Sequence, residues 1–243
     1  MSSLSVFLHL PLLVMERLVV ISGIMLANNY MDTIIYLIRH GETEGADIRR
    51  YKGSLDIPLS EQGIKQIERA SVYILKDLQK QPDQPSPPSL LKAVYCSDLQ
   101  RAIRSAEIIS KDHFLDPVIV PSLRERNFGM WEGMSFDEIR ERYPVEFDAW
   151  ADNPLRFSPM QGESTLAMGK RVIEAFEKIL SDHKGERIAI VSHGGVNRII
   201  LCHVLGISLK NIFRVEQDYA ALNIIEFRDR YPAVRLMNWR DDG

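Results

Sequence analysis

Apolar residues recur along the chain in two patterns, as short β-branched runs and as longer segments with helical spacing. The short runs predict buried strands, because a strand covered on both faces is apolar at successive positions. Buried strands are expected at 33–38 and 187–192, and further strands at 91–95, 118–120, 222–227 and 233–237. Segments with apolar residues every three or four positions predict helices within 60–78, 97–110, 136–143, 165–182 and 196–205.

Capping residues and prolines set the expected ends of these helices. Ser135 and Glu138 form a capping box, so a helix should begin directly after Ser135. Pro144 should end that helix, since proline cannot continue it. Either Ser97 or Asp98 is expected to cap the helix that follows the second strand.

The order of the elements predicts the fold class. Strands that alternate with helices are typical of an α/β domain whose mostly parallel sheet lies between two helix layers. We therefore expect a three-layer α/β/α sandwich over residues 31–243. Ligands of such folds bind at the carboxyl ends of the strands, near a point where the strand order reverses.

Residues 1–30 are apolar, but their pattern is not that of a membrane span or a signal peptide. No Lys or Arg precedes the apolar run, and Pro11 interrupts it. Glu16 and Arg17 divide it into stretches too short to cross a bilayer. We expect an extension outside the fold, with no stable membrane insertion; a membrane-associated anchor is the alternative.

Composition narrows the function classes. The formal net charge is −3 and no basic stripe is present, which argues against nucleic acid as a partner. Anion binding must then come from a few placed arginines. Cys96 and Cys202 lie in apolar runs and are expected to be buried free thiols of a cytoplasmic protein. No metal and no cofactor is expected, and the oligomeric state stays open, with a homodimer as one option.

Two predicted strands end in a histidine followed by a glycine. At the first, Arg39 offers a planar fork of donors to phosphate oxygens. His40 can act as a nucleophile when one ring nitrogen is held as N–H. Gly41 would let the backbone approach a ligand. The alternative is an ordinary strand-end histidine beside a solvated arginine, since the motif is short.

The second histidine, His193, ends the fourth predicted strand and precedes a helix that begins near Gly194. Backbone N–H groups and the positive end of the helix dipole would favour an anion at Gly194. A structural histidine is the alternative for His193 alone. Its pairing with His40 on an equivalent strand end favours a shared site.

Three further charged residues are candidates for the same edge of the sheet. Arg101 and Arg104 lie three apart on a helix that starts just after a strand, so one of them can reach back over the sheet. A solvated helix face suits Arg104 better. Glu125 is a candidate general acid, and the alternative is a surface salt bridge with its arginine neighbours.

A family resemblance emerges when six segments are taken together. They are RHGET (39–43), GSLDIPLSEQG (53–63), SDLQRA (97–102), ERNFGMWEG (125–133), GES (162–164) and SHGG (192–195), in this order. The chain resembles the histidine phosphatase superfamily, in its phosphoglycerate mutase-like branch, over residues 33–227. The resemblance implies a phosphoglycerate mutase-like fold and a metal-independent phosphatase acting on a small-molecule phosphate ester.

The resemblance also implies a role for each matching residue. His40 would take the phosphoryl group and become a phosphohistidine. Arg39, Arg101 and His193 would hold the phosphoryl oxygens, which stabilises the charge that develops during transfer. Glu125 would protonate the leaving alkoxide and then help to activate water.

One departure from the family pattern concerns phosphate binding. Family members often carry Trp-Asn after RHGET-x, where the Asn contacts phosphate, but this chain has Gly45 and Ala46. Arg49, Arg50 or Ser54 could supply the missing contact.

The member of the family is a finer question. ERNFGMWEG is closer to monofunctional phosphatases than to mutases, and the tail 213–227 is similar to α-ribazole phosphatases of cobalamin synthesis. The expected substrate is α-ribazole 5′-phosphate. A phosphoglycerate mutase and a catalytically silent phosphate-binding module are the alternatives. Loops 79–89 and 151–163 are expected to select the substrate.

Overall fold

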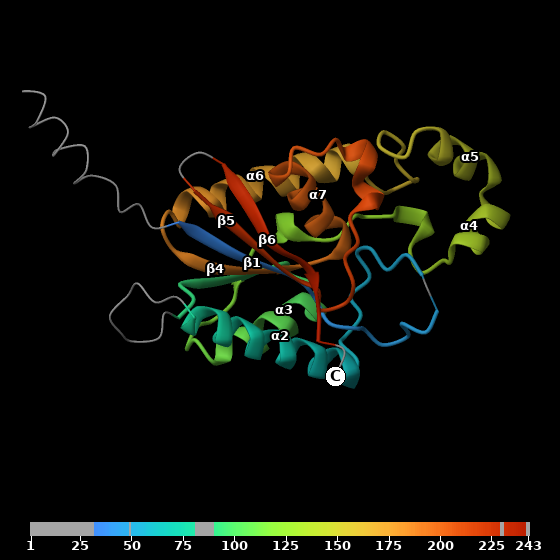
Figure 1. The fold of residues 1–243 in the computed structure, drawn as a ribbon. Coiled ribbons are helices and arrows are strands. Elements are labelled where there is room, and N and C mark those ends of the chain that lie inside the picture. Colours follow the sequence, from blue (N-terminus) through green and yellow to red (C-terminus); the bar gives the residue numbers. More distant parts are fainter. Residues whose placement is uncertain (1–31, 49, 81–89, 229–230, 242–243) are drawn as a thin grey trace, which may run out of the picture. The chain divides into compact units, whose positions relative to one another are not determined.

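A computed structural model of the chain describes residues 32–48, 50–80, 90–228 and 231–241. Within these residues one six-stranded sheet has the order β3-β2-β4-β1-β5-β6 (Figure 1). Its strands are β1 (Thr33–Arg39), β2 (Ala93–Cys96), β3 (Val118–Ile119), β4 (Arg187–Ser192), β5 (Leu222–Phe227) and β6 (Pro232–Trp239).

The sheet is mostly parallel, as the sequence predicts. β1, β4, β2 and β3 run parallel to one another, whereas β5 pairs antiparallel with both β1 and β6. β1 and β4 are adjacent, with Arg39 opposite Ser192 at their carboxyl ends. The residues that follow these two strands therefore emerge side by side at one edge of the sheet.

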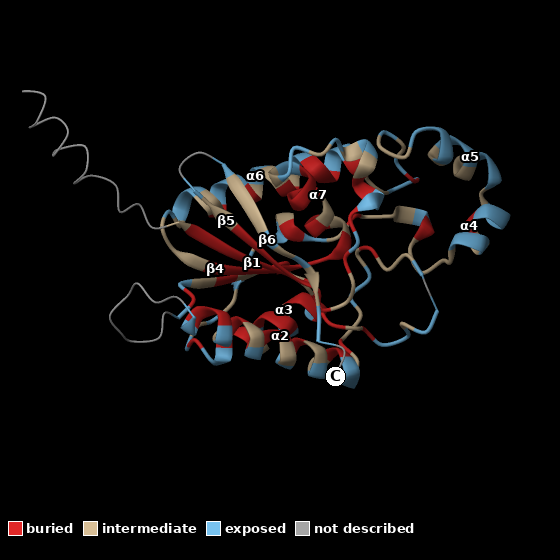
Figure 2. Ribbon diagram, viewed as in Figure 1, coloured by how far each residue is buried: buried red, intermediate tan, exposed pale blue. Residues whose placement is uncertain are grey.

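Two helix layers cover the sheet, which confirms the predicted three-layer sandwich. α2 (Glu61–Gln79) and α3 (Gln100–Lys111) lie on one face, and α6 (Thr165–Asp182) and α7 (Gly194–Val204) lie on the other (Figure 1). Alternate residues of β1 serve the two layers: Tyr36 packs toward α2 and α3, and Leu37 toward α6 and α7. Figure 2 shows β1, β4 and β5 and the inner helix faces as largely buried, whereas β6 is mostly intermediate. The apolar runs of the sequence thus fill the two cores between the layers.

The expected start of α3 is wrong in its detail. The N-cap is Leu99, which makes no side-chain capping bond, and neither Ser97 nor Asp98 takes that position. The carboxylate of Asp56, on a distant loop, accepts the Gln100 N–H over 2.7 Å. A side chain remote in sequence thus supplies the acceptor that a local cap would have given.

Pro144 ends one helix but also begins another. α4 (Phe136–Arg142) starts with the predicted capping box of Ser135 and Glu138. α5 (Pro144–Asp152) follows directly, with Pro144 at its first position, where the missing N–H costs nothing. The sequence analysis missed this helix because it treated proline only as a helix terminator.

Other predictions fall partly outside the described residues. Residues 1–31, Arg49 and the proline-rich stretch 81–89 are among those not described. Among the residues that are described, no helix is both long and apolar enough to cross a membrane. Cys96 and Cys202 are buried free thiols, as expected.

Candidate active site

The two strand-end histidines lie against each other. The rings of His40 and His193 have centroids 5.1 Å apart and meet edge to face at 62°. Their backbones are tied together where β1 and β4 end, because the His40 N–H donates to the Ser192 carbonyl over 2.9 Å. Both side chains are buried. The prediction that adjacent parallel strands bring these two residues together is confirmed.

His40 is held in one tautomer by its own turn. Nδ1 lies 2.7 Å from the Gly41 carbonyl oxygen. A carbonyl oxygen can only accept, so Nδ1 carries the proton and Nε2 keeps its lone pair. Burial lowers the pKa of His40 well below its ordinary 6.5, and the charges of Arg101 and Arg39 lower it further. A neutral imidazole with a free Nε2 is the form that a nucleophile needs.

His193 is oriented from the opposite side. Its Nε2 lies 2.7 Å from the Ser97 hydroxyl. Nδ1 is buried, and within the described residues it has no hydrogen-bond partner. If the hydroxyl donates to Nε2, Nδ1 carries the proton and can donate it to a bound anion. Burial lowers the pKa of His193 too, and the adjacent His40 ring adds to this shift.

Arg39 and Arg101 reach the same place from different elements. Arg39 donates through Nη1 to the Gln217 carbonyl over 2.7 Å, and its Nε is buried without a partner among the described residues. Arg101 is almost fully buried on α3 and donates to the carbonyls of Leu55 and Gly53. Backbone carbonyls orient both guanidinium groups without neutralising their charge. The two arginines therefore form a fixed pair of cations beside His40.

Arg104 does not join these two arginines. It is exposed and pairs with Glu107 on the same helix over 2.9 Å. The expectation of a solvated helix face is confirmed for this residue.

Glu125 lies outside the helices and strands, directly before Arg126, and its carboxyl group contacts the start of α7. Its Oε1 accepts the Arg126 N–H over 2.8 Å, and its Oε2 accepts the Gly195 N–H over 2.9 Å. A Cβ at residue 195 would overlap Oε1, so a glycine is needed there for the carboxylate to approach. The Glu125 carboxyl group thus occupies the Gly195 N–H in the first turn of α7, and an external anion at Gly194 stays a prediction.

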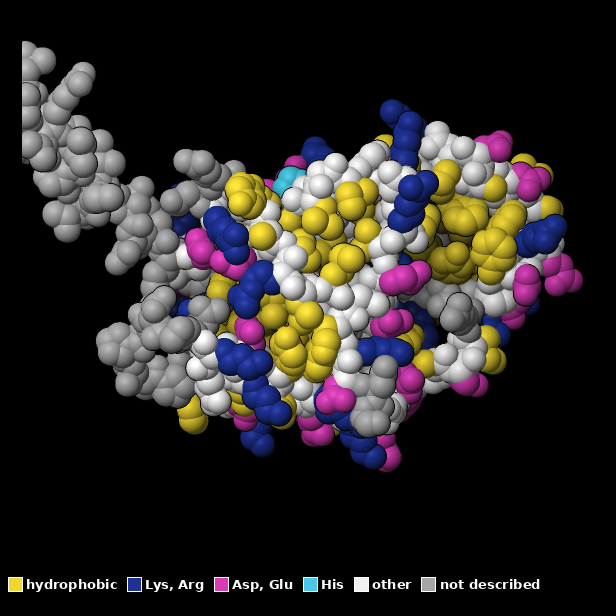
Figure 3. All heavy atoms as spheres, in the orientation of Figure 1, with side chains coloured by type: hydrophobic (Ala, Val, Ile, Leu, Met, Phe, Trp, Pro, Cys, Tyr) yellow, Lys and Arg dark blue, Asp and Glu magenta, His cyan; other side chains and the backbone are white. Residues whose placement is uncertain are grey.

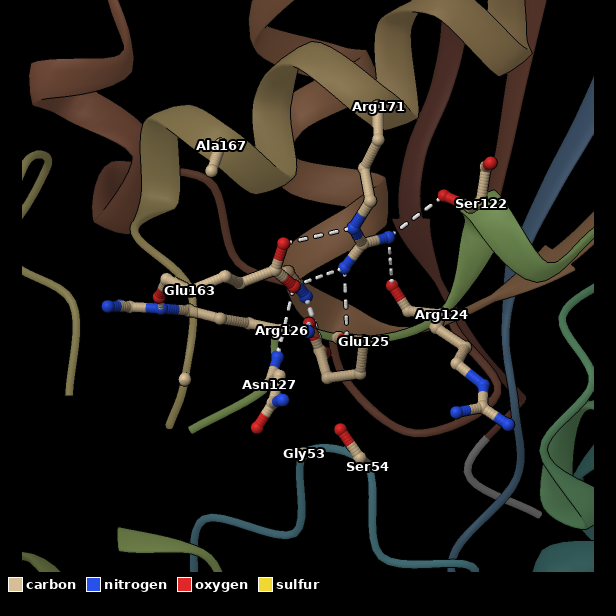
Figure 4. Close-up of polar contacts among 12 residues, drawn as sticks. Gly53, Ser54, Ser122, Arg124, Glu125, Arg126, Asn127, Glu163, Ala167 and Arg171 are labelled. Atoms are coloured by element: carbon tan, nitrogen blue, oxygen red, sulfur yellow. Dashed lines mark hydrogen bonds and ion pairs between the residues drawn. The ribbon is translucent and has the colours of Figure 1, made fainter. Parts of the chain in front are cut away.

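The backbone around Glu125 is fixed by Arg171 of α6 (Figure 4). Arg171 donates to the carbonyl oxygens of Ser122, Arg124 and Glu125 at 2.8 to 3.2 Å. Glu163 holds the same guanidinium group at 2.5 Å. One half-buried arginine thus joins the GES segment, α6 and the segment that carries Glu125, which fixes the backbone at Glu125.

Gly41 has a packing role that the sequence does not indicate. A Cβ at this position would overlap the carbonyl oxygen of Gly63, in the first turn of α2. The glycine is therefore required by packing between two segments of the chain. The expectation that it also makes room for a ligand stays a prediction.

The remaining sequence candidates are occupied by protein partners. Gly194 lies beside the Arg39 guanidinium group. Arg50 lines the cavity, but it pairs with Glu138 at 2.5 Å and donates to the Gly133 carbonyl. The Ser54 N–H donates to the carboxylate of Glu132. Arg50 is therefore a weaker candidate for the contact that Ala46 lacks, whereas the Ser54 contact occupies only its backbone N–H.

A cavity of about 440 Å³ opens above the histidines. Arg39, His40, Arg101 and Glu125 form its floor, and aromatic side chains form much of its wall, including Phe128, Trp131, Trp150 and Phe213. Trp131 and Trp150 are in edge-to-face contact, which links the wall to α5. Figure 3 shows hydrophobic side chains gathered over α4 and α5. The site thus joins an anion-binding floor to an apolar wall.

Three cavity residues escaped the sequence analysis. Lys52 donates to the Thr43 hydroxyl and to the Glu44 carbonyl over 3.0 Å, and its charge contributes to the lowered pKa of His40. Arg198 lies one helical turn after Gly194, a spacing that could have identified it. Tyr219 stacks on Arg39, and nothing in its local sequence signals this.

The fold and the site together define a phosphatase of the histidine type. Residues 35–240 match the histidine phosphatase superfamily (branch 1), and the chain belongs to this family. The predicted family and fold class are therefore confirmed. Within the described residues, no three His, Cys, Asp or Glu side chains are grouped as a metal site would require.

Three proteins show which phosphatases of this family the chain is similar to. A metal-independent phosphoserine phosphatase of Arabidopsis thaliana is 36% identical over 201 residues, which are 82% of this chain and 78% of that protein. Phosphoserine phosphatase 1 of Hydrogenobacter thermophilus is 28% identical over 204 residues, covering 84% of this chain and 91% of that protein. The crystal structure of the α-ribazole phosphatase from Shigella flexneri has a TM-score of 0.72 at 26% identity, covering 86% of this chain and 98% of that one.

Proposed function

We propose that the chain is a phosphomonoester phosphatase that works through a phosphohistidine at His40. One observation carries the proposal. The unprotonated Nε2 of His40 faces a cavity whose floor also holds Arg39, Arg101 and Glu125, with His193 in ring contact. A nucleophile, fixed cations and a carboxyl group within one cavity are the parts that phosphoryl transfer requires.

The chemistry follows from these positions. His40 Nε2 attacks phosphorus in line with the ester bond, forming a P–N bond as the P–O bond to the leaving group breaks. Arg39, Arg101 and His193 hold the phosphoryl oxygens, and Glu125 gives its proton to the departing alkoxide. In the second step water attacks phosphorus, Glu125 takes a proton from it, and the P–N bond breaks to release inorganic phosphate.

The aromatic wall supports a substrate with a planar apolar leaving group. Of the aromatic side chains that line the cavity, Phe128 and Trp150 are partly exposed and can contact a planar ring, whereas Trp131 is buried and stacks on Phe157. α-Ribazole 5′-phosphate combines a phosphate with a benzimidazole ring and suits this arrangement. The structural likeness to an α-ribazole phosphatase also supports it. We propose this substrate class first.

O-Phospho-L-serine is the second candidate. Two relatives over most of the chain are phosphoserine phosphatases. The cavity also holds Lys52 and Arg198 beyond the two phosphate-facing arginines, and a cation of this kind could receive a substrate carboxylate.

The test is a phosphate-release assay in EDTA with α-ribazole 5′-phosphate, O-phospho-L-serine and 3-phosphoglycerate. We expect the highest kcat/KM for α-ribazole 5′-phosphate and no requirement for bisphosphoglycerate. His40→Ala should lose turnover and acid-labile phosphoenzyme, whereas the exposed control His203→Ala should keep both. Interconversion of phosphoglycerates without phosphate release would favour a mutase. Phosphate binding without turnover of any ester would favour the silent module.

Trp150→Ala separates the two substrate candidates. This variant should lower kcat/KM for α-ribazole 5′-phosphate and leave kcat/KM for O-phospho-L-serine nearly unchanged. Only the first substrate carries a ring that is long enough to contact the aromatic side chains of the cavity. A higher kcat/KM for O-phospho-L-serine in the wild-type protein would overturn the choice of substrate and leave the phosphohistidine mechanism standing.

A further inference from the structure

Tyr219 is fixed beside His40 by the backbone on both sides of it. The Ala220 N–H donates to the His40 carbonyl over 3.1 Å, and the Arg39 N–H donates to the Ala221 carbonyl over 3.0 Å. Asp218 is bound to Asn238 of β6 through its own N–H, over 2.8 Å. Tyr219 therefore sits on a segment that joins the end of β1 to the far strand of the sheet.

A strained turn aims the ring at the site. Ala220 has a φ of 55°, in the left-handed region that residues with a Cβ seldom adopt. Such conformations persist where the surrounding structure imposes them, and they are common at functional sites. Here the two backbone hydrogen bonds to the end of β1 impose it. The turn directs Tyr219 into the cavity above the histidines.

The Tyr219 ring contacts the phosphate-binding groups. Cζ of Arg39 lies 4.0 Å from the ring centroid, and the His40 and Tyr219 rings have centroids 5.7 Å apart. Burial lowers the pKa of both Arg39 and Arg101, and Tyr219 is among the groups that oppose this shift in each case. The phenol thus lies within electrostatic range of both guanidinium groups.

Among the described residues no hydrogen bond joins the phenol hydroxyl to another protein group, and half-buried Tyr219 lines the cavity beside Arg39 and His40. Its surroundings are cationic, so the group that it would bond is an anion. The segment with Gly45 and Ala46 does not line the cavity, and no side-chain amide from there can reach a bound phosphate.

We propose that the Tyr219 hydroxyl donates a hydrogen bond to a non-bridging oxygen of the transferred phosphoryl group. The inference rests on the proposed phosphatase function. No proton is transferred: the phenol keeps its hydrogen while the phosphoryl group moves from the ester to His40 and then to water. Tyr219 thereby supplies a third type of donor beside the arginines and His193, and its ring face keeps Arg39 in place.

Tyr219→Phe tests the hydroxyl alone, because the Phe ring can still stack on Arg39. A hydrogen bond to a charged acceptor implies a loss in kcat/KM of about 10- to 100-fold. The loss should be equal for p-nitrophenyl phosphate and for an alkyl phosphate, since the contact is to the phosphoryl group. The Kd for inorganic phosphate, measured by calorimetry without turnover, should rise as well.

Two further variants complete the experiment. Tyr219→Leu removes the stacked ring too and should lose more than Tyr219→Phe at an unchanged melting temperature. Tyr231→Phe removes a hydroxyl from an exposed tyrosine and should change neither readout. The proposal is overturned if Tyr219→Phe keeps wild-type phosphate affinity and kcat/KM, or if its loss is confined to one leaving group. A wild-type protein with neither turnover nor phosphate affinity would instead remove the proposed function, and this inference with it.

Discussion

The carboxylate of Glu125 accepts the backbone N–H of Gly195 over 2.9 Å, across 70 residues of sequence. Gly195 lies in the first turn of the helix that follows His193, so the same turn orients the second histidine and the carboxyl group. His40, the proposed nucleophile, is bound through its backbone N–H to the Ser192 carbonyl at the end of β4, directly before this turn. The end of β4 and the start of α7 therefore position the proposed acid relative to the proposed nucleophile.

Glu125→Gln should slow poor leaving groups more than good ones. The amide keeps the shape of the side chain but cannot supply a proton, and general acid catalysis is worth roughly 10²- to 10⁴-fold. We expect kcat for an alkyl phosphate to fall in that range and kcat for p-nitrophenyl phosphate to fall much less. Steady-state kinetics on both substrates provide the measurement, with the exposed Glu141→Gln as control. Equal slowing of both substrates would remove Glu125 from the acid role.

Gly195→Ala should reproduce part of this effect without touching a titratable group. The new Cβ would overlap Oε1 of Glu125 and push the carboxylate away from the site. Because a displacement of about 1 Å can cost a hundredfold in rate, we expect a loss of about that size on alkyl phosphates.

The matched control is Gly169→Ala, in the middle of α6, where a Cβ would make an ordinary contact with Leu209. It should keep full activity and should not lower the melting temperature. If Gly195→Ala were as active as Gly169→Ala, the close approach of residue 195 to Glu125 would have no part in catalysis.

The mostly parallel sheet and the paired histidines could be predicted from the sequence because both depend on local patterns. β1 and β4 are apolar at nearly every position, and each is followed by His-Gly, which places His40 and His193 at one sheet edge in any parallel arrangement. Local patterns also gave the capping box at Ser135.

The contacts that could not be predicted join segments far apart in sequence. Asp56 accepts the Gln100 N–H at the start of α3. Tyr219 stacks on Arg39, although the two residues are 180 positions apart in the sequence (219 − 39). Neither residue stands in a pattern that marks its role. Gly41 shows the converse: its motif was recognised, but the neighbour that requires a glycine, Gly63, becomes visible only in three dimensions.

Ser97→Ala should weaken phosphate binding through His193. The Ser97 hydroxyl lies 2.7 Å from Nε2 of His193, and the role proposed for His193 requires that it donate there, so that Nδ1 carries the ring proton. Without the hydroxyl, that tautomer is no longer selected, and we expect kcat/KM to fall about tenfold, the effect of one lost hydrogen bond.

Ser110→Ala is the control for Ser97→Ala, since Ser110 is equally buried and its hydroxyl has no partner among the described residues. It should leave kcat/KM unchanged. The decisive readout is the ¹⁵N shift of the His193 ring nitrogens, which should report a mixed tautomer in Ser97→Ala only. A pure Nδ1–H tautomer in that variant would contradict the role given to the hydroxyl.

The stability of the ligand-free protein should fall as the pH drops below 6.5, because His40 and His193 have folded-state pKa values well below that of a free histidine. Below pH 6.5 the unfolded chain binds protons at these two positions and the folded protein does not, so unfolding is favoured. The contribution is fully present above pH 6.5 and is lost progressively toward the lowered pKa values. Each histidine can contribute at most about 1.4 kcal/mol per pH unit within that window.

Urea unfolding at several pH values between 7.5 and 5 measures this dependence. His193→Asn removes one of the two groups, so its unfolding free energy should fall less steeply with decreasing pH than that of the wild type, while the exposed control His203→Asn should retain the steep slope. The same protonation should also disable the nucleophile, so kcat/KM should stay level down to a pH below 6.5 before it declines. An identical pH slope in His193→Asn and the wild type would show that His193 does not enter the folded protein as a neutral group.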